Sequence, residues 1–272
     1  MRTSLVVVRE LKSLEEFRQV EEIQRRVWGM ADVDVVPYHF LRAVADKGGV
    51  VLGAFVDNRM VGFVAGVLGW WRGRLIHYSH MLAVLPEYRG RGIGYQLKLA
   101  QRARALEQGV DLIVWTFDPL RVINGWLNVH KLGGIVRHYL VNYYGEMRDA
   151  LNRGIPSDRF LVEWWIKSRR VRKRIEGEAR RCSAEAPVVL RVVDVQNPQL
   201  RLEILEREHR VLVPLPFRTD WPPNVQQWRS VTREVFSRAF AQGFIVTDMV
   251  RLGRGLCAYL MERKPLEEVL AE

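Results

Sequence analysis

The amino-acid sequence predicts an α/β protein with a mixed central sheet, followed by an α+β extension. Over residues 1–145, short apolar segments alternate with amphipathic segments of helical period, the pattern of strands and helices packed in layers. A glycine-rich turn joins one of these strands to a helix, and the rhythm of the pattern changes after Gly145. We therefore expect two domains, residues 1–150 and residues 151–272.

Clear start and stop signals define the first elements. Residues 5–9 are expected to form a strand. Ser13, with Glu16 three residues later, forms a capping pattern that opens a helix ending near Gly29. Turn residues then separate the next expected elements, which are a short helix at 39–45 and strands at 50–56, 60–68 and 75–85.

A second helix and strand follow the glycine-rich turn. One apolar stripe predicts a helix from Gly92 to Gln108, and the apolar run 111–117 predicts a buried strand. Asp118 and Pro119 suit the N-cap and first position of another helix, running to about residue 132. A strand at 135–141 completes the expected order of strand, two helices, three strands, helix, strand, helix and strand.

The remaining residues predict an extension of mixed type. Its expected elements are strands at 159–166, 188–193, 202–213, 244–250 and 255–261, a helix at the basic run 167–174, a Pro-rich turn at 214–223 and a helix at 226–241. No internal repeat or low-complexity segment is found.

Composition sets the broad class of the protein. With 48% hydrophobic and 27% charged residues and no apolar run long enough to span a membrane, the chain is expected to be cytoplasmic, with no membrane partner. The first ten residues lack a signal-peptide cleavage site. Cys182 and Cys257 are the two cysteines, and their wide separation argues against a disulfide framework or a zinc site.

The net charge of +11 leaves two interpretations open for the basic run. The excess divides about evenly between residues 1–150 and 151–272, so it is diffuse. Its densest part, KSRRVRKR at 167–174, either contacts nucleic acid or forms the solvated face of a helix. The solvated face is favoured, because most charge runs are simply solvated.

The turn from Arg89 to Gly94 gives the clearest indication of a binding site. Backbone N–H groups at a helix start lack partners, and together with the positive end of the helix dipole they form a phosphate site. Gly90, Gly92 and Gly94 let the backbone approach a ligand closely, while Arg89 and Arg91 add positive charge.

The segment MLAVLPEYRGRGIGYQLKLA, residues 81–100, resembles motif A of the GCN5-related N-acetyltransferase (GNAT) superfamily. That motif is Arg or Gln, two residues, Gly, one residue, then Gly or Ala, and Arg89, Gly92 and Gly94 occupy these places. The resemblance covers about residues 1–145 and implies a mostly antiparallel central sheet flanked by helices. Residues 155–165 also resemble the tail of a poorly characterised group of predicted acetyltransferases with long C-terminal extensions.

The resemblance implies acetyl-CoA as co-substrate and no metal. By its pattern, the backbone of Leu82, Ala83 and Val84 pairs with the pantetheine arm of the cofactor. The pyrophosphate is held by the loop residues Arg89, Gly90, Arg91, Gly92, Ile93 and Gly94. Asn124 is a further cofactor-binding candidate, although it is offset from the place of the superfamily's usual asparagine.

His80 is the expected catalytic base, with Tyr78 beside it. Residues two apart in a strand share a face, so Tyr78, His80, Leu82 and Val84 are expected on one side and His77 on the other. The resemblance places a glutamate or a histidine at Tyr78 and a histidine at His80 in other members. A histidine titrates near neutrality, which suits a base or a water relay; a packed strand histidine is the alternative.

The general acid implied by the resemblance is missing, because Val129 stands at the place of the usual tyrosine. A substitute from His130, Tyr139, Tyr143 and Tyr144, or departure of the thiolate without an acid, stays open. The resemblance also implies that the loop between the first two helices borders the acceptor. Its acidic and aromatic residues suit an amine, and an ordinary loop capped by acids is the equal alternative; the residues are Trp28, Asp32, Asp34, Pro37, Tyr38 and His39.

The sequence thus predicts an acetyl-CoA-dependent N-acetyltransferase that acts on a small-molecule or peptide amine. The alternatives are a coenzyme A binding module without transfer activity and, less favoured, a nucleic-acid binding protein acting through residues 167–181. Assembly into a homo-oligomer is left open.

Overall fold

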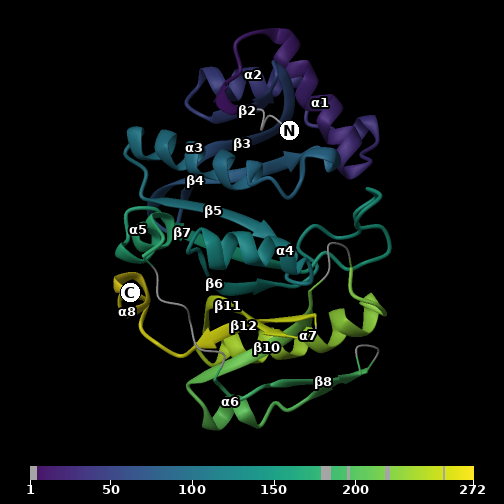
Figure 1. Ribbon diagram of the computed structural model, residues 1–272, viewed down its shortest axis with the longest axis vertical. Coiled ribbons are helices and arrows are strands. Elements are labelled where there is room, and N and C mark those ends of the chain that lie inside the picture. Colours follow the sequence, from purple (N-terminus) through teal and green to yellow (C-terminus); the bar gives the residue numbers. More distant parts are fainter. Residues whose placement is uncertain (1–4, 179–184, 195–196, 218–220, 254) are drawn as a thin grey trace. The chain divides into compact units, whose positions relative to one another are not determined.

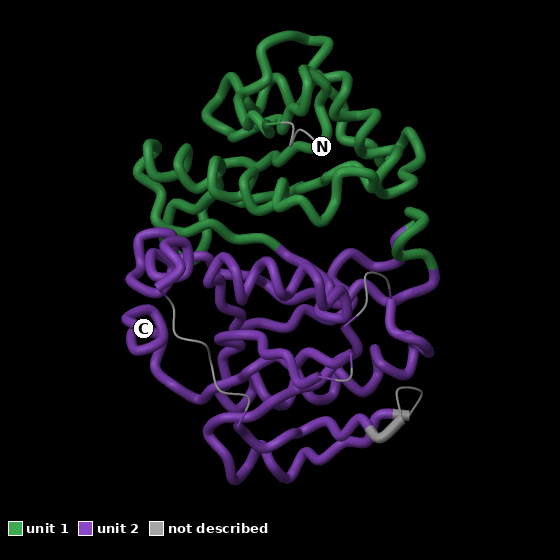
Figure 2. Tube along the Cα trace, in the orientation of Figure 1, with its two compact units in different colours: residues 1–115, 148–153 green, residues 116–147, 154–272 purple. Residues whose placement is uncertain are grey.

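The computed structural model describes residues 5–178, 185–194, 197–217, 221–253 and 255–272. The chain divides into two compact units, unit 1 with residues 1–115 and 148–153 and unit 2 with residues 116–147 and 154–272 (Figure 2). The two units are defined by their compactness alone. The boundary that the sequence predicts near residue 150, between a cofactor-binding domain and an extension, therefore stays a prediction. Cys182 lies outside the described residues, and Cys257 is a buried free thiol.

Unit 1 is built on an antiparallel sheet with one parallel strand at its side. The strands lie in the order β1 (Val6–Glu10), β2 (Val50–Val56), β3 (Arg59–Trp71), β4 (Arg74–Val84) and β5 (Leu112–Phe117), of which residues up to Trp115 belong to this unit. Neighbours from β1 to β4 are antiparallel, and β5 is parallel to β4. The mixed, mostly antiparallel sheet predicted from the sequence is therefore confirmed.

Three helices flank this sheet, with two short 3-10 turns between them. They are α1 (Leu14–Trp28), α2 (Tyr38–Asp46) and α3 (Ile93–Glu107), with η1 at Asp32–Asp34 and η2 at Pro86–Tyr88. The predicted capping of α1 is confirmed, because Ser13 Oγ accepts the Glu16 N–H at 3.2 Å. Gly29 ends α1 in the left-handed region, with φ of 64°.

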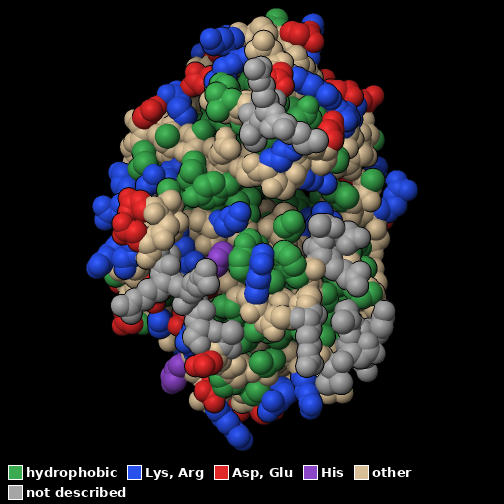
Figure 3. Space-filling view, in the orientation of Figure 1, with side chains coloured by type: hydrophobic (Ala, Val, Ile, Leu, Met, Phe, Trp, Pro, Cys, Tyr) green, Lys and Arg blue, Asp and Glu red, His purple; other side chains and the backbone are tan. Residues whose placement is uncertain are grey.

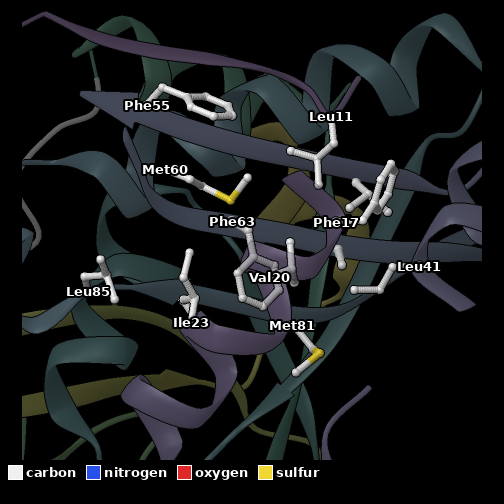
Figure 4. Packing of buried hydrophobic residues seen from close by; sticks show 13 residues of the cluster. Leu11, Phe17, Val20, Ile23, Leu41, Phe55, Met60, Phe63, Met81 and Leu85 are labelled. Atoms are coloured by element: carbon white, nitrogen blue, oxygen red, sulfur yellow. The ribbon is translucent and has the colours of Figure 1, made fainter. Parts of the chain in front are cut away.

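The helices of unit 1 form layers on both faces of the sheet (Figure 1). On one face, α1 and α2 bury an apolar cluster that includes Phe17, Val20, Phe63 and Met81 (Figure 4). On the other face, Leu97 and Ile93 of α3 pack on strand residues such as Val64. The middle strands are thus covered on both sides, which accounts for the unbroken apolar run of β2.

Unit 2 contains a second antiparallel set of strands. Their order is β7 (Arg159–Trp165), β6 (Ile135–Leu140), β11 (Ile245–Gly253), β12 (Leu256–Glu262) and β10 (Arg210–Pro216), and β8 (Leu190–Asp194) pairs separately with β9 (Asn197–Leu200). Its helices are α4 (Val122–Gly125), the π-helix η3 (Trp126–Lys131), α5 (Arg169–Glu176), α6 (Ile204–Arg207), α7 (Val225–Ala241) and α8 (Leu266–Ala271).

The predicted start of the helix after β5 was wrong. Arg121, not Asp118, stands at the N-cap, and the helix continues from α4 into η3. The Asp118 carboxylate instead accepts the Leu120 N–H at 2.9 Å and pairs with Arg229 and Arg159. Because ion pairs occupy this carboxylate, it is held in a tight turn before the helix.

The prediction for the extension was wrong in part. Residues 202–213 are not one strand, because α6 and then β10 occupy them, and β9 and α8 were missed. Pro214 and Pro216 belong to β10 and not to a turn, although residues 218–220 of that predicted turn lie outside the described residues. A strand can hold these prolines because β10 lies at the end of the strand order, where a missing N–H costs no pairing.

The favoured interpretation of the basic run was also wrong for two of its arginines. Arg170, only 4% exposed, donates to the carbonyls of Gly133 at 3.1 Å and Thr247. Arg174 donates to Asp248 at 2.5 Å and to the His130 carbonyl at 3.2 Å. Part of this charge therefore holds unit 2 together and is not available to a nucleic acid.

On the face shown in Figure 3, Lys and Arg side chains are scattered among acidic and apolar ones rather than gathered in one patch. Within the described ranges, no helix combines the length and apolar character needed to cross a membrane.

A glycine comparison in β3 tests the packing of unit 1. A Cβ on Gly66 would lie 2.4 Å from His77 Nε2 and 2.6 Å from the Tyr78 carbonyl, whereas a Cβ on Gly69 would meet Ile76 only at 3.7 Å. Gly66→Ala should therefore lower the free energy of unfolding by about 1–3 kcal/mol, and Gly69→Ala should change it by less than about 0.5 kcal/mol. Urea unfolding followed by circular dichroism measures both; equal losses would contradict this packing.

Candidate functional site

The glycine-rich loop has a backbone that two of its glycines make possible. β4 ends at Val84, the turn η2 follows, and Gly90 and Gly92 then adopt φ of 76° and 77°. A Cβ on either glycine would meet no atom within 4 Å, so the left-handed backbone, rather than crowding, requires glycine there. Gly92 is the N-cap of α3, and the predicted position of the loop at a helix start is confirmed.

The backbone N–H groups of this loop are free to bind an anion. Among the described residues, those from Gly90 to Tyr95 donate no hydrogen bond, and the first helical bond runs from the Gln96 N–H to the Gly92 carbonyl. They lie at the positive end of the α3 dipole. Unpartnered donors at the start of a long helix form a site for phosphate.

The two loop arginines fold back on the loop. Arg89 Nε donates to the Val84 carbonyl at 3.2 Å, and Arg91 donates to the Glu87 carbonyl at 3.2 Å. The Glu87 carboxylate is neutralised by Arg26 at 3.1 Å and Arg59 at 3.5 Å. The loop therefore presents net positive charge despite this acid.

The sheet opens beside the loop. β4 and β5 pair at His77 with Ile113 and at Tyr78 with Val114, and no further pairing between them is found in these two fully described strands. We call this point the fork; Ser79 and Trp115 are the first residues beyond it. Past the fork, β4 still pairs with β3 on its other edge through Leu82 and Ala83. Beyond the fork, the backbone N–H and C=O groups on this edge of β4 are therefore not paired with β5.

A bulge in β4 corrects the predicted strand faces. Ser79 lies opposite Gly66 and Met81 opposite Ala65, so His80 is an extra residue in the ladder. The prediction that Tyr78, His80, Leu82 and Val84 share one face was wrong, since an extra residue reverses the alternation.

The two faces can be assigned from the packing. Met81 and Ala83 pack in the cluster under α1 and α2, and the register places Tyr78 on the same face. Leu82 and Val84 pack toward α3, the face to which His77 also belongs. Tyr78 and His80 remain neighbours, with ring centroids 5.8 Å apart.

His80 has properties that suit a base. Its side chain is exposed, yet the surrounding protein removes enough solvent to lower its pKa below the ordinary 6.5. The imidazole is therefore neutral at pH 7 and can accept a proton.

The structure also shows a buried polar cluster that the sequence did not reveal. Lys98, only 3% exposed, donates to Ser79 Oγ at 3.1 Å and to Gln101 Oε1 at 2.7 Å, and its Nζ lies 3.6 Å from the Trp115 ring centroid. Gln101 Nε2 lies 3.1 Å from His77 Nε2. Burial lowers the pKa of Lys98 well below 10.5, and burial together with Lys98 lowers the pKa of His77 to about 3.

One sequence signal could have suggested this cluster. Lys98 and Gln101 are three residues apart on α3, so they share a helix face, and Ser79 and His77 are polar residues in an otherwise apolar strand. The sequence pattern alone places Lys98 and Gln101 with the polar residues of α3, where exposure is the ordinary expectation.

The remaining cofactor and acid candidates lie in unit 2. Asn124 is exposed on α4, and its N–H donates to the Arg121 carbonyl at 2.8 Å. Val129, at the place of the missing acid, is fully buried. Their roles toward a ligand stay predictions.

Three of the four possible substitutes for the acid are engaged within unit 2. Tyr139 donates to Asp158 at 2.6 Å, and burial raises the pKa of its phenol, which disfavours proton loss. Tyr144 Oη lies 2.8 Å from Thr116 Oγ1, and His130 Nδ1 lies 3.0 Å from Asp248. Tyr143 is exposed.

The predicted acceptor loop is partly engaged in the packing of unit 1. Asp32 accepts from Arg25 Nε at 2.8 Å, the Tyr38 N–H donates to Glu21 at 2.6 Å, and the Trp28 ring packs edge-on against Phe63. Asp34, Pro37 and His39 are exposed. Within the described ranges, no group of three or more His, Cys, Asp or Glu side chains is placed to hold a metal ion.

These features define an α/β protein whose sheet opens beside a glycine-rich loop with unpartnered backbone N–H groups at a helix start. Residues 14–122 match the model of the acetyltransferase (GNAT) family. This part of the chain belongs to the GNAT superfamily, as the loop motif predicted, and acyl transfer from acetyl-CoA is the general activity of that family. Among curated proteins, none matches the chain.

Several solved structures resemble the chain at low identity. An acetyltransferase of the GNAT family from Streptococcus pneumoniae is 16% identical with a TM-score of 0.49, covering 58% of this chain and 98% of that one. Ard1 from Thermoplasma volcanium is 18% identical with a TM-score of 0.43, covering 58% and 95%. The NatC complex bound to Gag peptide and CoA contains a chain 20% identical with a TM-score of 0.46, covering 58% and 96%.

The buried lysine predicts a specific pH dependence of stability. Because the pKa of Lys98 is lowered in the folded state, the unfolded chain binds more protons below pH 10.5, so stability rises with pH in that range. The free energy of unfolding of the native protein, relative to Lys98→Met, should therefore increase from about pH 7 to about pH 10.

The comparison of the native protein with Lys98→Met serves as its own control, because over this pH range the titration of every other group is common to both proteins. His77 titrates below its ordinary pKa of 6.5 and so falls outside this pH range. Urea unfolding at several pH values gives the difference directly. Parallel curves for the two proteins would show that Lys98 is not perturbed.

Proposed function

We propose that this protein is an acetyl-CoA-dependent N-acetyltransferase that acts on a small-molecule or peptide amine. One observation carries the proposal, namely the opened edge of β4 next to the unpartnered N–H groups from Gly90 to Tyr95. The N–H groups suit the pyrophosphate of acetyl-CoA, and the free strand edge suits the amide-bearing pantetheine arm.

In this proposal each part of the site has a separate task. The backbone of Leu82 and Ala83 pairs with the pantetheine arm, while the Val84 carbonyl accepts from Arg89 and so helps to fix the loop. The amides of Gly90 to Gly94 and the charge of Arg89 and Arg91 hold the pyrophosphate.

The proposed reaction is direct transfer. Acetyl-CoA supplies an activated acetyl group; the amine nitrogen forms a bond to the carbonyl carbon, the carbon–sulfur bond breaks, and coenzyme A leaves as a thiolate that takes a proton from water. His80 takes the proton that the amine loses, directly or through a water molecule, since its imidazole is neutral at pH 7. Tyr78, 5.8 Å away between ring centroids, orients the imidazole.

The buried Val129 supports one alternative. A valine at the place of the usual acid leaves the departing thiolate without a donor there, so a module that binds coenzyme A without transfer is the second candidate. Turnover separates the two, because both bind coenzyme A.

Binding is tested by calorimetric titration of coenzyme A. The native protein should bind, and Arg89→Gln/Arg91→Gln should bind on the order of tenfold more weakly because two charges near the phosphates are lost. Arg201→Gln/Arg238→Gln removes equal charge from exposed positions outside the site and should leave binding unchanged. Absence of binding to the native protein rules out the proposal.

Transfer is tested by release of free thiol from acetyl-CoA in the presence of a panel of amines and peptides. His80→Gln should lower kcat roughly 100-fold or more while coenzyme A affinity stays within about twofold. His209→Gln, at an exposed histidine, should keep full activity. Binding without turnover on any amine supports the inactive module instead.

The pH dependence of kcat/KM gives an independent test of His80 as the catalytic base. Because its pKa is lowered, kcat/KM of the native protein should stay high below pH 6.5 and fall only as the pH drops through that lowered value. A fall that begins above pH 6.5 would assign the proton transfer to another group.

A further inference from the structure

Lys98 lies at the fork of the sheet. The last paired residues of β4 and β5 are Tyr78 and Val114, and the first residues beyond them are Ser79 and Trp115. Lys98 Nζ contacts both of these first residues, at 3.1 Å from Ser79 Oγ and 3.6 Å from the Trp115 ring centroid. One side chain from α3 thus bridges the two strands where their backbone pairing stops.

Lys98 Nζ has polar and aromatic partners around it. It donates to Ser79 Oγ and Gln101 Oε1 and lies over the face of the Trp115 ring. Gln101 in turn reaches His77, which is paired with Ile113 just before the fork. The cluster therefore ties the last paired segment of β4 to the first unpaired residues of both strands.

Packing alone does not require a lysine here. Transfer of an amine from water to a buried site has a large free-energy cost, and a Met side chain of similar length would fill the same space without it. The hydrogen bonds to Ser79 and Gln101 offset part of that cost and add direction, because hydrogen bonds fix the distances between partners whereas apolar contacts allow those distances to vary.

We propose that Lys98 is a positioning residue that fixes the separation of β4 and β5 at the fork and, through it, the strand edge that receives the pantetheine arm. This inference rests on the proposed function. In this inference Lys98, which is 3% exposed, acts through Ser79 and Trp115 and not by contact with the cofactor.

The proposal separates the two ends of the cofactor. The pantetheine arm needs the opened edge of β4, whereas the nucleotide end needs the glycine loop. A change at the fork should therefore weaken binding of the whole coenzyme and spare its nucleotide end. A general loss of stability would weaken both.

The test uses calorimetry with two probes, coenzyme A and its adenosine bisphosphate fragment, which lacks the pantetheine arm. Lys98→Met should lower coenzyme A affinity on the order of tenfold and leave fragment affinity within about twofold. Lys47→Met makes the same change at an exposed lysine of unit 1 and should alter neither. Ser79→Ala removes one acceptor and should weaken coenzyme A binding in the same selective way.

A double-mutant cycle tests the bridge itself. Because Lys98 and Ser79 share one contact, the loss in Lys98→Met/Ser79→Ala should be smaller than the two single losses combined. Additive losses, equal losses for both probes, or an unchanged Lys98→Met would overturn the inference. If Lys98→Met does not fold, the selectivity of Ser79→Ala decides in the same way. Failure of the native protein to bind coenzyme A overturns the proposed function, and the inference with it.

Discussion

The candidate site depends on the end of backbone pairing between β4 and β5. Two parallel strands that stayed paired would leave no free edge beside the glycine loop. Pairing stops after Tyr78 and Val114, and a bulge at His80 follows at once in β4. Because β3 still holds the other edge of β4, the strand stays ordered while one edge opens, which is the geometry an extended ligand needs.

Sequence reasoning succeeded where the controlling interaction is local. Positive φ demands glycine at Gly90 and Gly92, and the Ser13 cap is set within one helical turn, so the loop and the start of α1 could be predicted from neighbouring residues alone. Sequence reasoning was wrong where residues distant in the chain determine the local structure. The bulge at His80 depends on the register with β3, and the turn at Asp118 depends on Arg229 and Arg159 from much later in the chain.

The buried charges show the same limit. Lys98, Arg170 and Arg174 look like ordinary surface residues in a helical pattern. Lys98 and Arg170 are nevertheless buried and Arg174 is half-buried, each with polar partners from other elements. Polar residues along one helix indicate a solvated face only when no polar side chain or backbone group of another element packs against them. Such partners are known only from the folded chain. For the candidate site, the glycine-rich loop could therefore be predicted from the sequence, whereas the fork and the strand faces could not.

The central claim is that backbone amides of the loop and of the opened strand edge bind coenzyme A. Amide hydrogen exchange with and without coenzyme A measures this at the groups concerned. The account predicts slower exchange on binding in peptides that contain Gly90 to Tyr95 and Leu82 to Val84, because ligand hydrogen bonds would cover those N–H groups. Unchanged exchange in these segments, with protection confined to other parts of the chain, would contradict it.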